Sequence, residues 1–395
     1  MEFLSVQQAA DKFGVTVRTV QKWAKENKLS GAKKVGREWL IPIVATGPCD
    51  SEFDKGLEDK KLTDAEIPLI ILKESFTPGS CLEHIEKIND ADSKNIAMAE
   101  YYYLRGEIEK SASIFERYVN HSDESMSFSA SFLYSFSNIS MNRPRIALLT
   151  LSDIRKYIFL KYKSGNTIKE NAPCIFISSI AGVLLHSEKI EITEMVKILK
   201  YLPEGSRMFG AYVMAHFAYQ KKDYSKAIGI AESAIAVSSA VYPVPFIYLK
   251  IILAVALINM KRIDEAVVAF NEALELALPD GFLKPFTEHH GLLLGLVEVC
   301  MKDKYPTEYR KITASVESFL SGWSDAHNAI NDRSVTANLT PTEFVVAMLF
   351  DRDWSMKEIS SYMNISLRMV KYYISTIYEK LCISRREELR EYMLK

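Results

Sequence analysis

The chain has 395 residues, of which 48% are apolar and 25% charged, and this composition excludes a disordered or fibrous protein. The formal net charge of −1 is unevenly distributed. Residues 1–45 hold eight Lys/Arg against four Asp/Glu, residues 339–395 hold nine against eight, and the segment between them is acidic overall. We therefore expect any contact with phosphates to be made by the two ends.

The cysteines and the apolar runs indicate in which cellular compartment the protein is expected. The cysteines are odd in number and lack metal-ligand spacing, so we expect reduced thiols and no bound metal; they are Cys49, Cys81, Cys174, Cys300 and Cys382. The longest apolar run, 251–260, is too short to cross a bilayer. The N-terminus begins directly with a capped helix rather than a signal peptide. We expect a cytoplasmic protein without a membrane segment.

The first predicted elements lie in residues 1–45. Ser5 and Gln8 have the spacing of a capping box, and apolar residues after them recur at helical intervals. Gly14 allows a tight turn, and Thr16 can cap a second helix. The exposed face of that second helix carries Arg18, Thr19, Lys22 and Lys25. Residues 33–41 alternate around a glycine, which predicts a small β-hairpin.

The order Phe3-Leu-Ser-Val-Gln-Gln, Gly14-Val-Thr-Val-Arg-Thr-Val-Gln-Lys-Trp and Val35-Gly-Arg-Glu-Trp-Leu-Ile-Pro resembles the excisionase-like branch of the MerR winged helix-turn-helix superfamily. This resemblance implies that the second helix reads the major groove and that the hairpin, as a wing, follows the DNA backbone or minor groove. We interpret Trp23 and Trp39 as core anchors and Lys25 as part of a solvated face. The candidate DNA-binding residues at this end are Thr16, Arg18, Thr19, Lys22, Gly36 and Arg37.

Residues 46–66 are rich in charged residues and poor in periodicity, which predicts a linker, and residues 67–321 follow helical periods almost throughout. Ala227 and Ala234 recur as Ala266 and Ala273, 39 residues later, and the segment from Gly106 is a degenerate copy. This pattern resembles tetratricopeptide-type repeats, which implies a superhelix of five or six helical hairpins. Its concave surface suits an effector (a peptide, a small molecule or a partner protein), and we expect the region to sense such an effector, to mediate oligomerisation, or both. Most aromatic residues of the region are interpreted as helix-packing residues.

Residues 322–338 are polar and predict a second linker. Four short helices are then predicted in residues 339–395 from their N-terminal capping residues, which are Thr340 with Glu343, Ser355 with Glu358, Ser366, and Ser384 with Glu387. Four capped helices in fewer than 60 residues are typical of a compact DNA-binding bundle.

The sequence Leu339-Thr-Pro-Thr-Glu, Ser355-Met-Lys-Glu-Ile, Val370-Lys, Ile377-Tyr-Glu-Lys-Leu and Ser384-Arg-Arg-Glu-Glu-Leu resembles the LuxR-type helix-turn-helix over its whole length. The resemblance implies that the third helix is the recognition helix and that the fourth supports dimerisation. It places Arg368, Lys371, Tyr372 and Ser375 near DNA and Lys380 near the DNA backbone. An alternative is that Lys380, Arg385 and Arg386 only form solvated ion pairs with Glu379, Glu387 and Glu388.

The sequence thus predicts a predominantly all-α protein: a central hairpin-repeat superhelix between an N-terminal winged helix-turn-helix and a C-terminal four-helix LuxR-type domain. We expect a sequence-specific regulator of transcription that binds double-stranded DNA as a homodimer, with no cofactor and no catalytic residue. A scaffold protein whose terminal domains contact proteins is the alternative. An enzyme is a third possibility, against which stands the absence of any recognisable nucleophile–base pair, metal spacing or phosphate loop.

Overall fold

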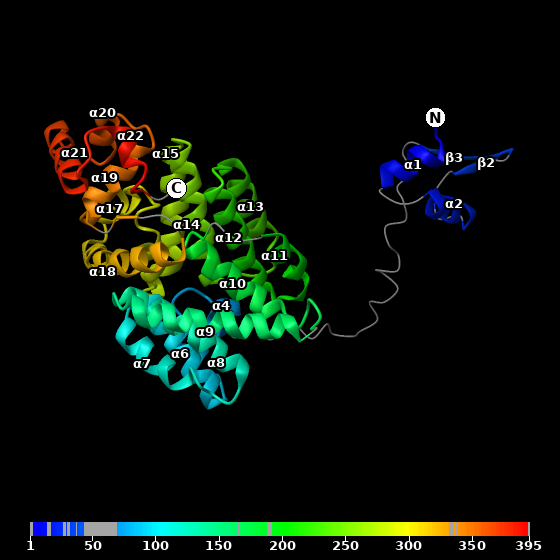
Figure 1. The fold of residues 1–395 in the computed structure, drawn as a ribbon, viewed down its shortest axis with the longest axis horizontal. Helices are drawn as coiled ribbons and strands as arrows, with labels where there is room; N and C mark the ends of the chain where they lie inside the picture. The colour runs from blue at the N-terminus through cyan, green and yellow to red at the C-terminus, as the bar shows by residue number, and fades with distance from the viewer. Residues whose placement is uncertain are drawn as a thin grey trace. The chain divides into compact units, whose positions relative to one another are not determined.

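The computed structural model describes residues 3–13, 17–26, 29, 32–36, 38–42, 69–164, 166–187, 192–331, 335–336 and 338–393. The chain divides into two compact units, residues 1–63 and 64–395, and each is considered by itself (Figure 1). Most of the predicted first linker, like Thr16 and Arg37, lies outside the described residues. Within the described part, the only strands belong to one small sheet and the rest of the regular structure is helical, as predicted.

The described part of the first unit contains two helices and three short strands. Helix α1 (Val6–Phe13) and helix α2 (Val17–Lys25) are followed by β2 (Lys33–Val35) and β3 (Glu38–Pro42), and β1 (Phe3–Leu4) pairs with the other edge of β3. The order β1-β3-β2 includes the predicted hairpin, whose turn contains Gly36 at a φ of +60°. Among the described residues of this unit, the buried apolar ones are Ala9, Ala10, Val20, Ala24, Leu29 and Ile41.

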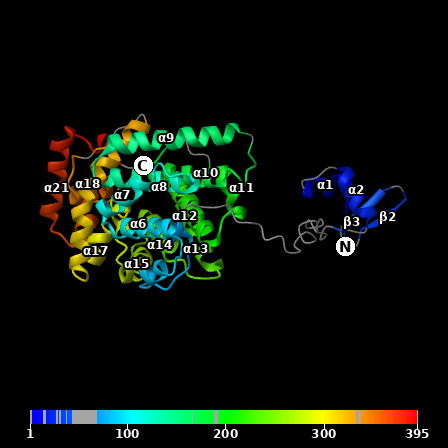
Figure 2. The same ribbon diagram turned by 90° about the horizontal axis from the view of Figure 1, so that it is seen from below.

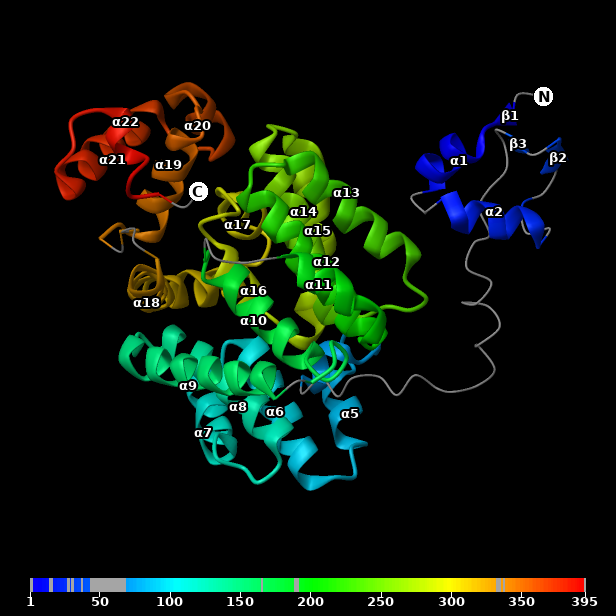
Figure 3. The ribbon, with the colours of Figure 1, turned by 45° about the vertical axis from the view of Figure 1, so that its right-hand side comes forward.

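The second unit is a stack of helices that mostly form antiparallel hairpins (Figures 1 and 3). Its N-terminal part contains α4 (Ile70–Lys73), α5 (Cys81–Glu86), α6 (Ala91–Arg105), α7 (Ile108–Tyr118), α8 (Glu124–Ser140) and α9 (Pro144–Lys163). Its middle contains α10 (Ala172–Leu184), α11 (Ile192–Ile198), α12 (Glu204–Gln220), α13 (Tyr224–Val237), α14 (Pro243–Asn259) and α15 (Ile263–Ala277). The hairpins α6–α7, α8–α9, α12–α13 and α14–α15 each join helices that are adjacent in sequence.

The two clearest hairpins repeat at the predicted interval. Helices α12 and α14 begin 39 residues apart, at Glu204 and Pro243, and α13 and α15 begin with the same offset. Ala227 and Ala266 are fully buried, so the two helices of each hairpin approach closely there. The connecting turns use the left-handed residues Lys222 and Lys261 at φ values of 61° and 58°. The internal repeat is therefore real, whereas its assignment to the tetratricopeptide family stays a prediction.

Helices α16 (Lys284–His289), α17 (Leu296–Met301) and α18 (Pro306–Ile330) follow. Helix α18 continues through the first half of the predicted 322–338 linker, so that boundary was placed too early. Tertiary contacts explain why the helix extends this far. The indole of Trp323 donates to the carbonyl oxygen of Leu184 at 2.7 Å, and His327 Nδ1 contacts the carbonyl of Leu185 at 2.8 Å. The rings of Trp323 and His327 also stack with their centroids 4.7 Å apart. These contacts bury a segment whose composition alone is polar.

The C-terminal segment forms α19 (Pro341–Asp351), α20 (Met356–Tyr362), α21 (Leu367–Leu381) and α22 (Arg386–Leu389). The apolar residues under these helices are continuous with the core of the hairpin stack. Among the described helices, none is both long enough and apolar enough to cross a membrane.

Candidate nucleic-acid interface

The N-terminal reader, by which we mean α1 and α2, is organised by local hydrogen bonds. The backbone N–H of Ser5 donates to Gln8 Oε1 at 2.9 Å, and the N–H of Gln8 donates to the Ser5 hydroxyl at 3.2 Å, which confirms the predicted capping box. Helix α2 buries Val20 and Ala24 and leaves Arg18 and Lys22 exposed. The cationic side chains therefore project from the side of α2 opposite the core.

The remaining N-terminal candidates differ in how they are placed. Thr19 is half-buried on α2, and Gly36 is exposed in the hairpin turn. Trp23 and Trp39 are partly buried against the small core, as expected of anchors. The hairpin is further tied to β1 by Lys33, whose ammonium lies 4.4 Å from the centre of the Phe3 ring.

The C-terminal reader consists of α19 to α22. Its first three helices begin at the predicted caps: the hydroxyls of Thr340, Ser355 and Ser366 accept from backbone N–H groups three residues ahead. The fourth cap was predicted one residue off. Glu388, rather than Glu387, accepts from the backbone N–H groups of Ser384 and Arg385, at 2.8 and 3.2 Å.

Helix α21 has one buried and one exposed face. Val370, Ile374, Ile377 and Leu381 are buried. The exposed face carries all four predicted base-reading residues, Arg368, Lys371, Tyr372 and Ser375. Tyr372 is 65% exposed, an unusual position for a large aromatic side chain unless it meets a partner. In Figures 1 and 2, α21 lies at the outer margin of its unit, so a duplex can approach this face.

Lys380 stands apart from these four residues. Its ammonium donates to both carboxylate oxygens of Glu343, at 2.9 and 2.7 Å, and so joins the end of α21 to the start of α19. Burial of Glu343 opposes its ionisation, but hydrogen bonds from Lys380 and Thr340 outweigh burial and hold the pKa of this carboxyl below its ordinary value. The geometry thus gives Lys380 an intramolecular partner that the sequence did not indicate.

The arginines at the start of α22 are also paired. Arg385 contacts Glu388 at 3.0 Å, which is the solvated kind of ion pair considered from the sequence. Arg386 instead contacts Asp353 at 3.2 Å, donates to the carbonyl of Phe350 and lies 4.3 Å from the centre of the Phe350 ring. It therefore stabilises the bundle.

A polar clamp attaches the C-terminal reader to the hairpin stack. The guanidinium of Arg352, at the end of α19, donates to the hydroxyls of Tyr224 and Tyr219 at 3.2 and 3.3 Å. Lys261, in the α14–α15 turn, donates to Glu358 of α20 at 2.8 Å. The hydrogen bond from Lys261 and those from Ser355 lower the pKa of the Glu358 carboxyl to about 2. Sequence reasoning missed this clamp because its partners are about 100 residues apart.

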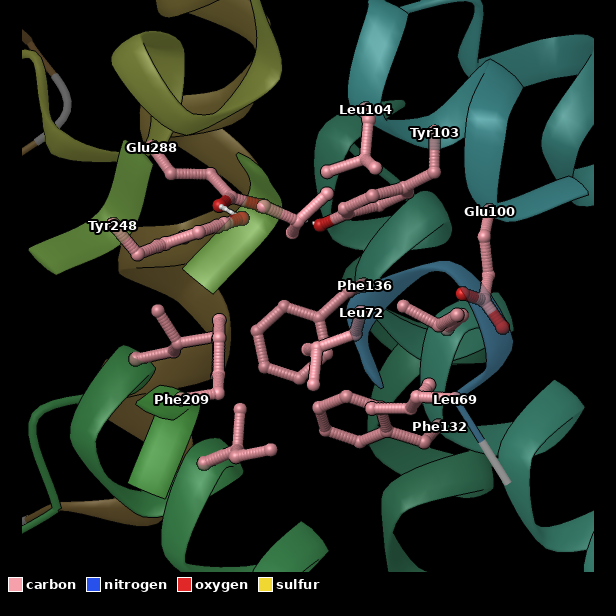
Figure 4. Close-up of a pocket in the computed structure, with 14 residues that line it drawn as sticks. Leu69, Leu72, Glu100, Tyr103, Leu104, Phe132, Phe136, Phe209, Tyr248 and Glu288 are labelled. Atoms are coloured by element: carbon pink, nitrogen blue, oxygen red, sulfur yellow. Dashed lines mark hydrogen bonds between the residues drawn. The ribbon is translucent and has the colours of Figure 1, made fainter. Parts of the chain in front are cut away.

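The centre of the second unit contains a cavity where α6, α8, α10, α12, α14 and α16 converge (Figure 4). Its free volume is about 50 Å³, several times the roughly 10–15 Å³ that one water molecule needs. Most of its wall is apolar and includes Phe132, Phe136 and Phe209. Glu288 provides the polar end, where the hydroxyls of Tyr103 and Tyr248 donate to its two oxygens at 2.5 and 2.8 Å.

A smaller cavity shares the wall residues Phe136, Leu184 and Glu288 with the first and is lined by histidines. His289 Nδ1 lies 2.8 Å from the carbonyl oxygen of Pro285 and must donate to it. Its Nε2 therefore accepts from the hydroxyl of Tyr212, 2.8 Å away, and that hydroxyl accepts from His216 Nδ1 at 2.9 Å. His216 Nε2 is left as a bare acceptor, buried and without a partner among the described residues.

This chain of hydrogen bonds requires neutral imidazoles. Burial lowers the pKa of His289 and takes that of His216 far below its ordinary range, and the nearby His186 is lowered to about 3 for the same reason. The cavities thus offer an apolar wall, a satisfied carboxylate and one uncharged acceptor.

Comparison with known proteins agrees with the resemblances at both ends. Residues 3–44 match the model of a helix-turn-helix domain, and residues 337–393 match that of the bacterial regulatory proteins of the luxR family. No curated protein and no solved structure matches the chain. The matched segments contain the two readers, each of which exposes a basic helix. The chain is a DNA-binding transcriptional regulator with a helix-turn-helix domain at its N-terminal end and a luxR-family domain at its C-terminal end.

Proposed function

We propose that this protein regulates transcription by reading specific double-stranded DNA sites with α21 and α2. The observation that carries the proposal is the exposed face of α21, where Arg368, Lys371, Tyr372 and Ser375 lie together on a capped helix with a fully packed opposite face. Such a helix fits a major groove, where arginine, lysine and hydroxyl groups read base edges.

At the other end, Arg18, Thr19 and Lys22 contact the groove, and the hairpin with Gly36 and Arg37 follows the DNA backbone. Thr16, which like Arg37 lies outside the described residues, completes the proposed set. Two readers in one chain bind a composite site more tightly than either alone, because the second contact is made at high effective concentration. Lys380 keeps its partner Glu343 and acts by positioning α21 rather than by contacting phosphate.

The test is selection of binding sites from a random duplex library with the full chain, followed by footprinting at two stated salt concentrations. Lys371→Ala is expected to weaken the selected site by about 1–3 kcal/mol and to relax base preference there. Lys226→Ala, which removes an exposed lysine from α13, is the matched control and leaves affinity unchanged. If the folded chain selects no site at the lower salt, the scaffold alternative replaces DNA reading.

The central unit, as part of the same proposal, senses a small neutral effector in the cavities. The first cavity is smaller than the roughly 150 Å³ of a cavity that takes benzene, so an effector with an apolar ring enters as the phenylalanine wall shifts. A single hydroxyl or N–H group on it can then donate to His216 Nε2, which lines the adjacent cavity. A charged ligand is disfavoured, because Glu288 already receives two tyrosine hydroxyls and has Lys284 at 3.8 Å.

Two probes of the same shape distinguish this role. We expect p-cresol, which has a hydroxyl donor, to raise the thermal midpoint of the full chain more than 4-methylanisole, which lacks one. Phe136→Trp fills the cavity and abolishes the shift, whereas Phe159→Trp, at an exposed position, retains it. Equal shifts with both probes, or a shift that survives Phe136→Trp, exclude the cavity as a donor-specific site.

We place the protein in the cytoplasm, acting as a homodimer. Paired copies suit DNA sites with two half-sites, because the symmetry of the protein is then repeated in the DNA.

A further inference from the structure

Helix α9 exposes an apolar surface to solvent. It packs on α8 and α18 through one side only, and Figure 2 shows it along an outer edge of its unit. Several large apolar side chains of this helix are exposed: Leu149 by 61%, Phe159 by 58% and Leu160 by 65%, with Ile146 and Tyr162 also exposed. Contiguous exposed apolar side chains on a folded protein mark an interaction surface.

A narrow stripe runs along this surface. Leu149, Asp153, Lys156 and Leu160 follow one another at intervals of four, three and four residues, so they share one face of the helix. The two charged side chains are 73% and 72% exposed and pair with each other at 2.9 Å. We call these four residues the α9 stripe. Its two leucines flank two opposite charges.

The α9 stripe is complementary to itself in the antiparallel direction. Its midpoint lies between Ile154 and Arg155, with Leu149 and Leu160 equally far from it and Asp153 and Lys156 equally near it. A two-fold axis through the midpoint places each Leu149 on the partner's Leu160 and each Asp153 beside the partner's Lys156. A surface that matches itself under rotation is the requirement for a C₂ interface.

We propose that α9 is the homodimer interface of this protein and that two copies pair through antiparallel α9 stripes. This interface rests on the homodimer of the proposed function and is the surface through which its two copies meet. It lies outside both readers. An open groove of about 490 Å³ between α9 and α10 is lined by α9 residues such as Ile154 and Tyr162, which lie on the opposite face of the helix from the stripe. A second copy seated on the stripe therefore leaves this groove uncovered, and the contact is a helix pair.

The first test is the mass of the full chain in solution without DNA, measured by sedimentation equilibrium. The expected mass is twice the 44.9 kDa of one chain. The double variant Leu149→Asp, Leu160→Asp is expected to sediment as a single chain with unchanged helix content, because both side chains are exposed in the monomer. A monomeric native protein overturns the proposal, and so does a double variant that remains dimeric.

The second test separates pairing between chains from the ion pair within one helix. Asp153→Lys and Lys156→Asp each place like charges opposite each other in a homodimer, so each variant alone is expected to be largely monomeric. A one-to-one mixture restores opposite charges across the interface, although each chain still carries like charges within its own helix. Heterodimers in the mixture therefore support the interface, whereas a mixture that behaves like its components overturns it.

The matched control is Glu265→Lys, which disrupts the corresponding ion pair between Arg262 and Glu265 on α15. This variant is expected to keep the native mass, and loss of the dimer here would overturn the assignment to α9. Measuring mass in the absence of DNA keeps the two proposals apart, because selection of a DNA site by a monomeric chain would refute only the α9 interface.

Discussion

The two readers of this protein present similar exposed helices, but the hydrophobic cores that support these helices differ. The N-terminal reader belongs to a unit with a core of its own, in which six of the described residues are buried apolar ones and three of these are alanines. The C-terminal reader shares one continuous core with the hairpin stack and is clamped to it by Arg352 and by the Lys261–Glu358 pair.

This difference determines how each reader can respond to the rest of the chain. A change in the α12–α15 hairpins acts on the C-terminal reader directly, because Tyr219, Tyr224 and Lys261 belong to those hairpins. The N-terminal reader forms a separate compact unit, so its fold is independent of that change. Regulation by an effector in the central cavity is therefore expected to affect α21 rather than α2.

Removing each reader in turn is expected to give the largest contrast. Deletion of residues 339–395 removes the polar clamp and cuts the core that these residues share with the hairpin stack, and each newly exposed large apolar group costs about 1.5–3 kcal/mol. The thermal midpoint of the remainder should fall by ~10 °C or more. Deletion of residues 1–66 should leave that midpoint nearly unchanged. If scanning calorimetry shows equal shifts of the thermal midpoint for the two deletions, the two readers do not differ in how they are attached to the rest of the chain.

A pH titration is expected to distinguish the two units next. Burial raises the pKa of Glu100 in the second unit to about 7, although its oxygens accept from the N–H groups of Ile70 and Ile71 at 2.7 Å. The folded state then holds a proton that the unfolded state has released, so stability decreases as pH rises from about 4.5 to about 7, by about 3 kcal/mol. Glu100→Gln should flatten this slope in chemical denaturation, while unfolding of the first unit should not change. A slope that persists in the variant would assign it to another group.

Cutting the clamp is expected to have a smaller effect. Arg352→Ala leaves the hydroxyls of Tyr219 and Tyr224 without their donor, which should cost about 1–3 kcal/mol of stability. Hydrogen exchange should increase in α19 and α20 but not in α1 and α2. Faster exchange in both readers would show that they are coupled in a way that the clamp does not explain.

The smallest expected effect separates a positioning lysine from a contacting one. Lys380→Ala should lower stability by about 1 kcal/mol, since Glu343 loses its partner, and leave the salt dependence of DNA binding unchanged. Lys22→Ala should leave stability unchanged and reduce the salt slope by about one unit. The reverse pattern would return Lys380 to the DNA backbone and remove Lys22 from it.

Local signals in the sequence predicted the helices and their exposed faces well. Capping pairs such as Ser5 with Gln8 and Thr340 with Glu343 are three residues apart, so they depend on nothing distant. The placement of Arg368 and Lys371 on the exposed face of α21 followed from the apolar period of the same helix. The 39-residue recurrence likewise gave the positions of two hairpins.

Features that depend on distant residues were not predictable in this way. The end of α18 is held by the carbonyl groups of Leu184 and Leu185, which accept from Trp323 and contact His327. Because of these contacts, a polar segment that was predicted to be a linker is helical. The partner of Lys380 is 37 residues away, and no periodicity indicates it. The cavity around Glu288 is lined by residues from Leu69 to Glu288, and only the packed fold brings them together.

Lys261 occupies the left-handed position of the α14–α15 turn and also holds Glu358. A single residue thus belongs both to the repeated hairpins and to the polar clamp that attaches the C-terminal reader. Because Lys261 lies at the tip of the α14–α15 hairpin, a tilt of that hairpin is expected to move α20 and, with it, α21. In the proposed homodimer, such a tilt is expected to change the distance between the two α21 helices.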